Sequence, residues 1–101
     1  MNSWDCPAVD ASDVTVKRRV QPRFPAAAME TGQPGDVTCV LVFRIDETGK
    51  PVDLEIEESC PAVYHDSLRE AGWKWRFYPY KNEQGQNVHA QFSLRVKFRL
   101  N

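Results

Sequence analysis

The 101-residue sequence lacks long apolar runs, and this limits how the chain can relate to a membrane. Its longest unbroken apolar run, from Cys39 to Phe43, is far below the roughly 20 residues that a helix needs to cross a bilayer. The first ten residues have neither a basic start nor an apolar stretch, so they are not a secretory signal peptide. If the domain works outside the cytoplasm, we expect the chain to be a fragment of a longer protein or to begin at an engineered methionine.

The sequence also lacks an excess of charge of one sign. It contains 13 Lys and Arg residues against 14 Asp and Glu residues, which gives a formal net charge of -1. A nucleic-acid-binding domain needs a concentrated cationic footprint, whereas the one basic cluster here, Lys17 to Arg19, is short. We therefore expect no nucleic-acid partner and interpret this cluster as a solvated segment.

Cysteine and histidine are scarce and show no metal-ligand spacing. The three cysteines form no C-x-x-C pair and have no ligand-like spacing with His65 or His89, so we expect no zinc site and no other cofactor. Cys39 lies in the apolar run and is interpreted as a small buried hydrophobe. Cys6 and Cys60 each precede a proline and are candidates for a disulfide in an oxidising compartment, with free thiols as the alternative.

A catalytic interpretation has weak support in the sequence. Cys60, His65 and Asp66 would be the candidate nucleophile, base and orienting residue. However, Cys60 precedes a proline at an expected helix start, and no oxyanion-forming glycine turn adjoins it. We therefore expect the chain not to be an enzyme.

The chain does contain regular alternation of apolar and polar residues. Residues 89–100 alternate without interruption, which predicts a long final strand with one apolar face and one polar, mostly cationic face. Every second residue from Val37 to Ile45 is apolar, which predicts one apolar face of an earlier strand, and the turn-forming residues 46–50 connect it to an alternating stretch at 52–57. These two stretches are predicted to form a β-hairpin.

Two helices are predicted on different grounds. The first begins near Pro25, continues through three alanines and a methionine, and ends at Gly32, a pattern typical of helix starts and stops. The second is preceded by Ser59 as a plausible cap, and its apolar residues recur on one side of a helix. These residues are Tyr64, Leu68, Ala71 and Trp75, and Gly72 is expected to mark the frayed end of the helix.

The order of elements predicts an α+β domain in which a three-stranded antiparallel sheet carries two helices packed on one face. A content of 42% hydrophobic and 27% charged residues suits one globular domain. We assign residues 1–20 to an N-terminal arm and residues 21–101 to the folded domain. Val40 and Val42 make their strand apolar on both faces, so we expect it to lie centrally in the sheet or to face a partner.

Five segments follow one another in a fixed order along the chain. They are Gln21-Pro22-Arg23-Phe24-Pro25, Gly35, the strand Val37 to Ile45 with Asp46 and Gly49, Trp75-Arg76-Phe77-Tyr78-Pro79, and Val96-Lys97-Phe98-Arg99-Leu100. This combination resembles the C-terminal domain family of the energy transducer TonB over residues 21–101. Phe24 replaces the family's usual tyrosine, and the stretch between Gly35 and Gly49 is two residues longer, an even number that preserves strand parity.

The resemblance implies a periplasmic protein-binding domain without cofactors, in an inner-membrane-anchored or exported parent protein. Such a domain captures a short segment of an outer-membrane transporter, the TonB box, by adding it to the outer edge of the last strand. It transmits energy for the uptake of substrates such as iron chelates or vitamins. The inner-membrane proton-driven motor would be reached only through an N-terminal segment that these residues lack.

The resemblance further implies a partner-binding surface on the last strand and beside Gln21. The implied residues are Gln21, Pro22, Arg23, Gln91, Ser93, Leu94, Arg95, Val96, Lys97, Phe98 and Arg99. The cationic side chains on this strand are expected either to favour acidic residues in the captured segment or to guard the edge against aggregation. The alternative function is a TonB-like sensor or assembly module that forms a homodimer, or occludes its own edge with residues 1–20.

Overall fold

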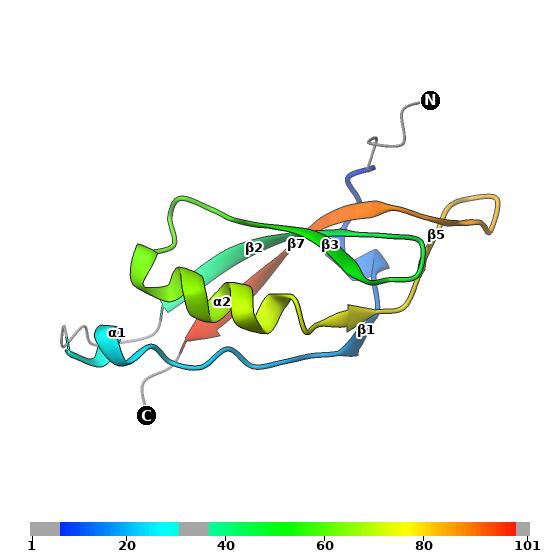
Figure 1. The fold of residues 1–101 in the computed structure, drawn as a ribbon. Helices are drawn as coiled ribbons and strands as arrows, with labels where there is room; N and C mark the ends of the chain where they lie inside the picture. Colours follow the sequence, from blue (N-terminus) through cyan, green and yellow to red (C-terminus); the bar gives the residue numbers. More distant parts are fainter. Residues whose placement is uncertain (1–6, 31–36, 99–101) are drawn as a thin grey trace.

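The computed structural model describes residues 7–30 and 37–98, and its centre is a three-stranded antiparallel sheet (Figure 1). Strand β2 (Val37–Ile45) lies between β3 (Pro51–Ile56) and β7 (Ala90–Phe98). The α+β fold predicted from the sequence is confirmed, and the last strand lies at the edge of the sheet. Among the helices of the described residues, none has the length and apolar character needed to cross a membrane.

Shorter elements precede β2 and connect β3 to β7. They are the 3-10 helix η1 (Ala11–Asp13), β1 (Val16–Arg18), α1 (Ala26–Glu30), the 3-10 helix η2 (Ala62–Tyr64), α2 (His65–Gly72), β4 (Arg76–Phe77), β5 (Tyr80–Lys81) and β6 (Asn87–Val88). Two small antiparallel pairs, β1 with β4 and β5 with β6, lie outside the main sheet. The β1–β4 pair attaches the chain before residue 20 to the segment that follows α2.

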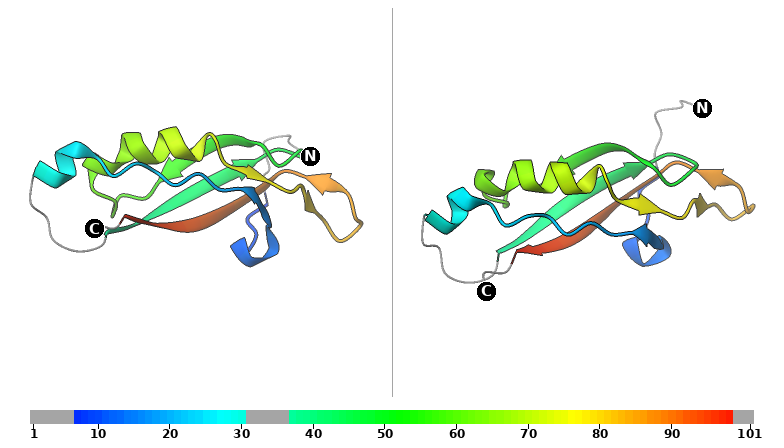
Figure 2. Two further views of the ribbon diagram at one scale, coloured as in Figure 1. Left: turned by 90° about the horizontal axis from the view of Figure 1, so that it is seen from below. Right: turned by 60° about the horizontal axis from the view of Figure 1, so that its bottom comes forward.

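One face of the sheet forms the core, and α2 with the segment that follows it covers this face (Figure 2). The alternating side chains of β2 that point there, from Cys39 to Ile45, are at most 1% exposed. Phe43 is the centre of an aromatic cluster, with ring centroids 5.4 Å from Trp75, 5.0 Å from Phe77 and 5.7 Å from Phe92. The apolar alternation in the sequence therefore corresponds to the buried face of the sheet.

The end expected for the second helix at its glycine is confirmed, although the apolar periodicity continues to Trp75. The helix ends at Gly72, where a Cβ atom would lie 2.9 Å from a methyl group of Leu54, so the helix end packs closely against the sheet. Trp75 enters the core from beyond the helix and is only 2% exposed. Ser59 does not cap the helix, because the N-cap position is held by Pro61 in η2 and by Tyr64 in α2, and neither cap makes a side-chain hydrogen bond.

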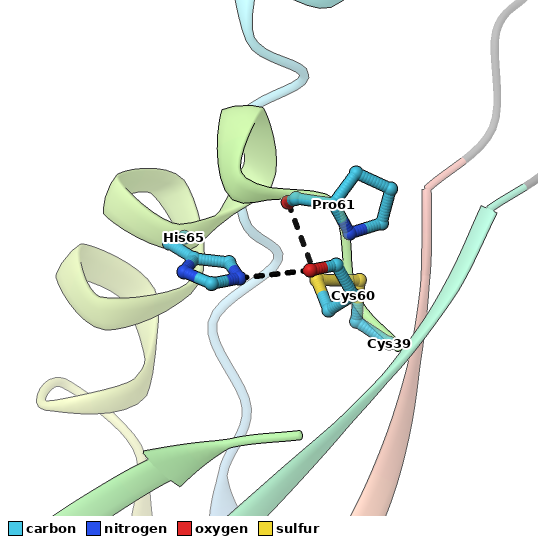
Figure 3. Close-up of a disulfide and its surroundings, with 4 residues drawn as sticks. All are labelled: Cys39, Cys60, Pro61 and His65. Carbon is cyan, nitrogen blue, oxygen red and sulfur yellow. Dashed lines mark hydrogen bonds between the residues drawn. A yellow bond between two sulfur atoms is a disulfide. The ribbon is translucent and has the colours of Figure 1, made fainter. Parts of the chain in front are cut away.

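The cysteine pairing differs from the expectation, since Cys60 is disulfide-bonded to Cys39 (Figure 3). The predicted pairing of Cys60 with Cys6 is wrong for this reason, and Cys6 lies outside the described residues. The segment after β3 returns to the core face of β2, which places the two Cα atoms 4.9 Å apart. The burial expected for Cys39 is confirmed, but its partner, 21 residues further along the chain, was not recognised from the sequence.

The turn between β2 and β3 is held by one aspartate and one glycine. Partial burial opposes ionisation of Asp46, but hydrogen bonds from the Thr48 hydroxyl and from the amides of Lys50 and Thr48 outweigh this effect and lower its pKa. Gly49 adopts a φ of 87°, and its carbonyl accepts a hydrogen bond from the Phe77 amide at 3.1 Å. The turn therefore packs directly against β4.

Replacing Gly49 with alanine is expected to destabilise the protein more than replacing Gly85. Both glycines have positive φ, so both substitutions carry a backbone cost of about 1–2 kcal/mol. A Cβ at position 49 would lie 2.0 Å from the Phe77 carbonyl oxygen, whereas a Cβ at position 85 meets nothing within 4 Å. Urea denaturation should show a loss of about 3 kcal/mol or more for Gly49→Ala and about 1 kcal/mol for Gly85→Ala. Equal losses would contradict the close approach of the turn to β4.

Reduction of the Cys39–Cys60 disulfide is expected to lower the free energy of unfolding by about 3 kcal/mol, because the bond closes a loop of about 20 residues. Denaturant titrations with and without a reductant measure this difference. The matched control is Cys6→Ala, which should leave both the stability and the response to reductant unchanged. A Cys6→Ala variant that no longer responds to reductant would instead support pairing of Cys6.

Candidate functional site

The backbone of β7 presents free hydrogen-bonding groups on its outer side. The carbonyl of Val40 accepts a hydrogen bond from the amide of Glu57, so the backbone of Val40 faces the β3 side of the sheet. In an antiparallel ladder its cross-strand partner Arg95 must then face away from β2, and Ser93 and Lys97 share this orientation. In the part of the chain that the structure describes, no backbone group bonds to the outward N–H and C=O groups of these three residues.

The same edge is occupied at its start by the N-terminal arm. The Val9 amide donates to the Gln91 carbonyl at 2.8 Å, and the Gln91 amide donates to the Pro7 carbonyl at 2.9 Å. Ala8 forms a parallel bridge with Gln91. Residues 7–9 thus use the outward groups of Gln91, and the free edge begins at Ser93.

A groove of about 840 Å³ lies beside the free part of the edge. One wall is the segment between β1 and α1, which runs along the length of the sheet in Figure 2, and the other is the end of β7. The lining residues are Arg19, Gln21, Pro22, Phe24, Thr38, Arg95, Lys97 and Phe98. An open volume therefore lies where a further strand would pair with β7.

The wall opposite β7 is anchored to the core at two points. The indole nitrogen of Trp75 donates a hydrogen bond to the Val20 carbonyl at 2.7 Å. The Phe24 ring contacts Tyr64 and Phe98 edge-on, with centroid distances of 6.0 and 6.3 Å. Because Trp75, Tyr64 and Phe98 are buried, the core fixes the position of this wall.

The groove is cationic. Arg19, Arg95 and Lys97 contribute positive charge, and among the described residues no aspartate or glutamate lines the groove. None of the ion pairs formed within the described residues involves these three side chains. On the opposite half of the sheet, by contrast, Arg44 is paired with two carboxylates of β3.

The structure brings part of the predicted partner-binding surface together. Gln21, Pro22, Arg95, Lys97 and Phe98 line the groove, and Ser93 lies on the same edge. Leu94 and Val96 direct their backbone groups to β2 and pack against the core. Arg23 lies apart from the groove, because its carbonyl accepts a hydrogen bond from a serine hydroxyl of α2. Arg99 is outside the described residues.

Sequence reasoning missed two parts of this site. Arg19 belongs to the cluster interpreted as solvated, yet its guanidinium lies 5.1 Å from the centre of the Trp75 ring, which orients it beside the groove. The contact of residues 7–9 with Gln91 was also missed as a specific pairing. Neither has a local signal in the sequence, because each contact joins segments more than 50 residues apart.

The three residues considered for catalysis do not form a catalytic arrangement. The sulfur of Cys60 is bonded to Cys39, so it is not a free nucleophile, and the Nε2 atom of His65 pairs with the Cys60 carbonyl at 2.9 Å (Figure 3). Across the described ranges, no cluster of three or more His, Cys, Asp and Glu residues is arranged to hold a metal ion.

Comparison with known proteins gives a consistent result. The sequence model of the family described as Gram-negative bacterial TonB protein C-terminal matches residues 20–100. Curated relatives named Protein TonB, from two strains of Xanthomonas campestris pv. campestris, are each 28% identical over 90 residues, covering 88% of this chain and 39% of the relative. A solution NMR structure of the Pseudomonas aeruginosa TonB CTD matches with a TM-score of 0.65 and 25% identity, covering 93% of both chains. These matches confirm the resemblance seen in the sequence.

The free edge predicts an alternating pattern of amide hydrogen exchange along β7. The amides of Ser93, Arg95 and Lys97 should exchange rapidly, whereas those of Leu94 and Val96, which face β2, should exchange at least about a hundredfold more slowly. Residue-resolved exchange measured by NMR on the isolated chain tests this. Uniform protection along the strand would show that the edge is covered in solution.

Proposed function

Because the chain belongs to the family of Gram-negative TonB C-terminal domains, we propose that it captures a short extended segment of a TonB-dependent outer-membrane transporter in the periplasm. The segment, corresponding to the TonB box, adds as a fourth strand to the free edge of β7. Energy for the uptake of substrates such as iron chelates or vitamins passes to the transporter through this strand. The chain spans 39% of the length of its curated relatives, and the inner-membrane motor would be reached only through a segment outside these residues.

The observation that carries this proposal is the coincidence of unpaired backbone groups with an open groove. The N–H and C=O groups of Ser93, Arg95 and Lys97 point to the side of β7 on which the groove lies. Strand addition uses main-chain groups for affinity and neighbouring side chains for specificity. An edge strand that borders an open volume with fixed walls suits this mode of recognition.

The affinity of an isolated peptide is expected to be modest. Three outward residues offer six backbone groups, and each net hydrogen bond contributes only about 1 kcal/mol. Association itself costs at least about 4 kcal/mol, so little free energy remains from the ladder alone. The lining side chains must therefore supply both additional affinity and selectivity.

The charges of the groove favour an acidic partner segment. Arg19, Arg95 and Lys97 have no carboxylate partner within the described residues, so an incoming Asp or Glu gains attraction without breaking an existing ion pair. Such rim charges also accelerate encounter, most strongly at low salt. The arrangement supports a binding role, and the disulfide at Cys60 argues against a catalytic one.

An NMR titration with N-terminal peptides of the host's outer-membrane transporters tests the proposed function. Chemical-shift changes should concentrate at residues 21–24 and 93–98, which form the two walls of the groove. Changes centred on residues 57–66, or no binding by any transporter peptide, would contradict strand capture at this edge. A homodimer formed through the same edge would appear as a doubled mass in the absence of peptide.

Reversing the charge of the groove should weaken the binding of a peptide that contains Asp or Glu. We expect the double variant Arg95→Glu/Lys97→Glu to lose about tenfold in affinity, since exposed ion pairs contribute about 0.2–1 kcal/mol each and reversal adds repulsion. The matched control is Lys50→Glu/Lys81→Glu, which makes the same change in net charge at exposed positions outside the groove. Calorimetry at low and high salt measures the peptide affinity of both variants. If the two variants lost equal affinity for the peptide, the effect would come from net charge alone and not from the groove.

A further inference from the structure

We propose that residues 7–9 are a built-in strand that closes one end of the partner-binding edge, so that an incoming segment must displace them to pair with Gln91. The identity of the incoming segment depends on the proposed function. The docking of residues 7–9 on β7 does not, because it depends only on contacts within the chain.

Residues 7–9 use the same backbone groups that a captured strand would use. Both the amide and the carbonyl of Gln91 are hydrogen-bonded to them, at 2.9 and 2.8 Å, and Ala8 bridges Gln91 in a parallel arrangement. Gln91 lies on the outward-facing side of β7 together with Ser93, Arg95 and Lys97. The edge therefore has four equivalent outward positions, of which the chain itself occupies the first.

The segment after residue 9 holds this strand close to the edge. The Asp10 carboxylate accepts hydrogen bonds from the amide and hydroxyl of Ser12, both at 2.9 Å, and so caps η1. These hydrogen bonds lower the pKa of Asp10. The Tyr78 amide then donates to the Thr15 carbonyl at 2.9 Å, which leads into the pairing of β1 with β4. Because this tether is short and anchored, residues 7–9 are present beside Gln91 at a high effective concentration.

The hold of these residues on the edge is nevertheless weak enough to be displaced. It consists of two backbone hydrogen bonds and the partly buried side chain of Val9, which packs against the core. The β2–β7 ladder, by comparison, pairs nine residues on each strand. A segment bound at Ser93 to Lys97 that extends towards Gln91 thus competes with residues 7–9 and leaves β7 in place.

The test compares Val9→Pro with Val9→Ala in the full chain. Both substitutions remove the packing of the valine side chain, but only proline removes the N–H that donates to the Gln91 carbonyl. In the free protein, the Gln91 amide should exchange about tenfold faster in Val9→Pro than in Val9→Ala, because the neighbouring bond to the Pro7 carbonyl is lost as residues 7–9 detach. The transporter peptide that binds the wild type best should bind Val9→Pro about three- to tenfold more tightly than Val9→Ala, with a new shift change at Gln91.

A pair of truncations gives the same comparison without substitution. Deletion of residues 1–9 removes the strand and leaves the Asp10 cap, whereas deletion of residues 1–5 leaves residues 7–9 in place. The longer deletion should match Val9→Pro in Gln91 exchange and in peptide affinity, and the shorter one should match the wild type. This pair decides the question if the proline variant does not fold.

The outcomes separate the two proposals. Equal Gln91 exchange in both members of each pair would overturn the docking of residues 7–9. Equal peptide affinity in both members, with shift changes confined to residues 93–98, would overturn competition and leave strand capture intact. Faster Gln91 exchange after removal of the strand, with no variant binding any peptide, would sustain the docking of residues 7–9 and reject the proposed function.

Discussion

The pairing of β2 on both of its edges is the constraint on which the rest of the molecule depends. Because β2 uses alternate backbone groups for β3 and β7, the backbone groups of every second residue of β7 point to the outer side, away from β2. The same residues carry the polar side chains, since the intervening residues fill the core. A shift of register by one residue would expose the core face, so the core and the free edge are determined together.

An uncovered edge strand is an aggregation hazard as well as a template for strand addition, and this edge is protected in two ways. Its outward-facing residues include Arg95 and Lys97, and its first position is already occupied by residues 7–9. Two copies that met edge to edge would bring these cations together, which disfavours a homodimer through β7. A segment with carboxylates meets no such repulsion, so under the proposed function the charges that limit self-association would also favour an acidic partner.

Periodicity predicted the three long strands, and the second apolar face formed by Val40 and Val42 indicated that their strand lies centrally in the sheet or faces a partner. The edge position of the last strand was expected from the family resemblance, because period and parity do not determine strand order. The helices were predicted less accurately, since Trp75 belongs to the helical pattern but enters the core from a loop. The Cys39–Cys60 bond, the stacking of Arg19 and the specific pairing of residues 7–9 with Gln91 were not predictable, although occlusion of the edge by residues 1–20 was one of the alternatives that the sequence left open. Each depends on segments that become neighbours only after the sheet and helix have packed, and local sequence propensity does not indicate contacts between distant segments.

The disulfide also defines how a pulling force would travel through the domain. Cys39 lies opposite Val96 in the ladder, level with the groove, and its bond to Cys60 joins the central strand to the segment that enters the helical layer. Tension applied along a strand on β7 would be shared by parallel rows of backbone bonds loaded in shear and then reach this covalent tie. The sheet could not peel away from its helices at that end without breaking a sulfur–sulfur bond, so a mechanically loaded domain would yield elsewhere first.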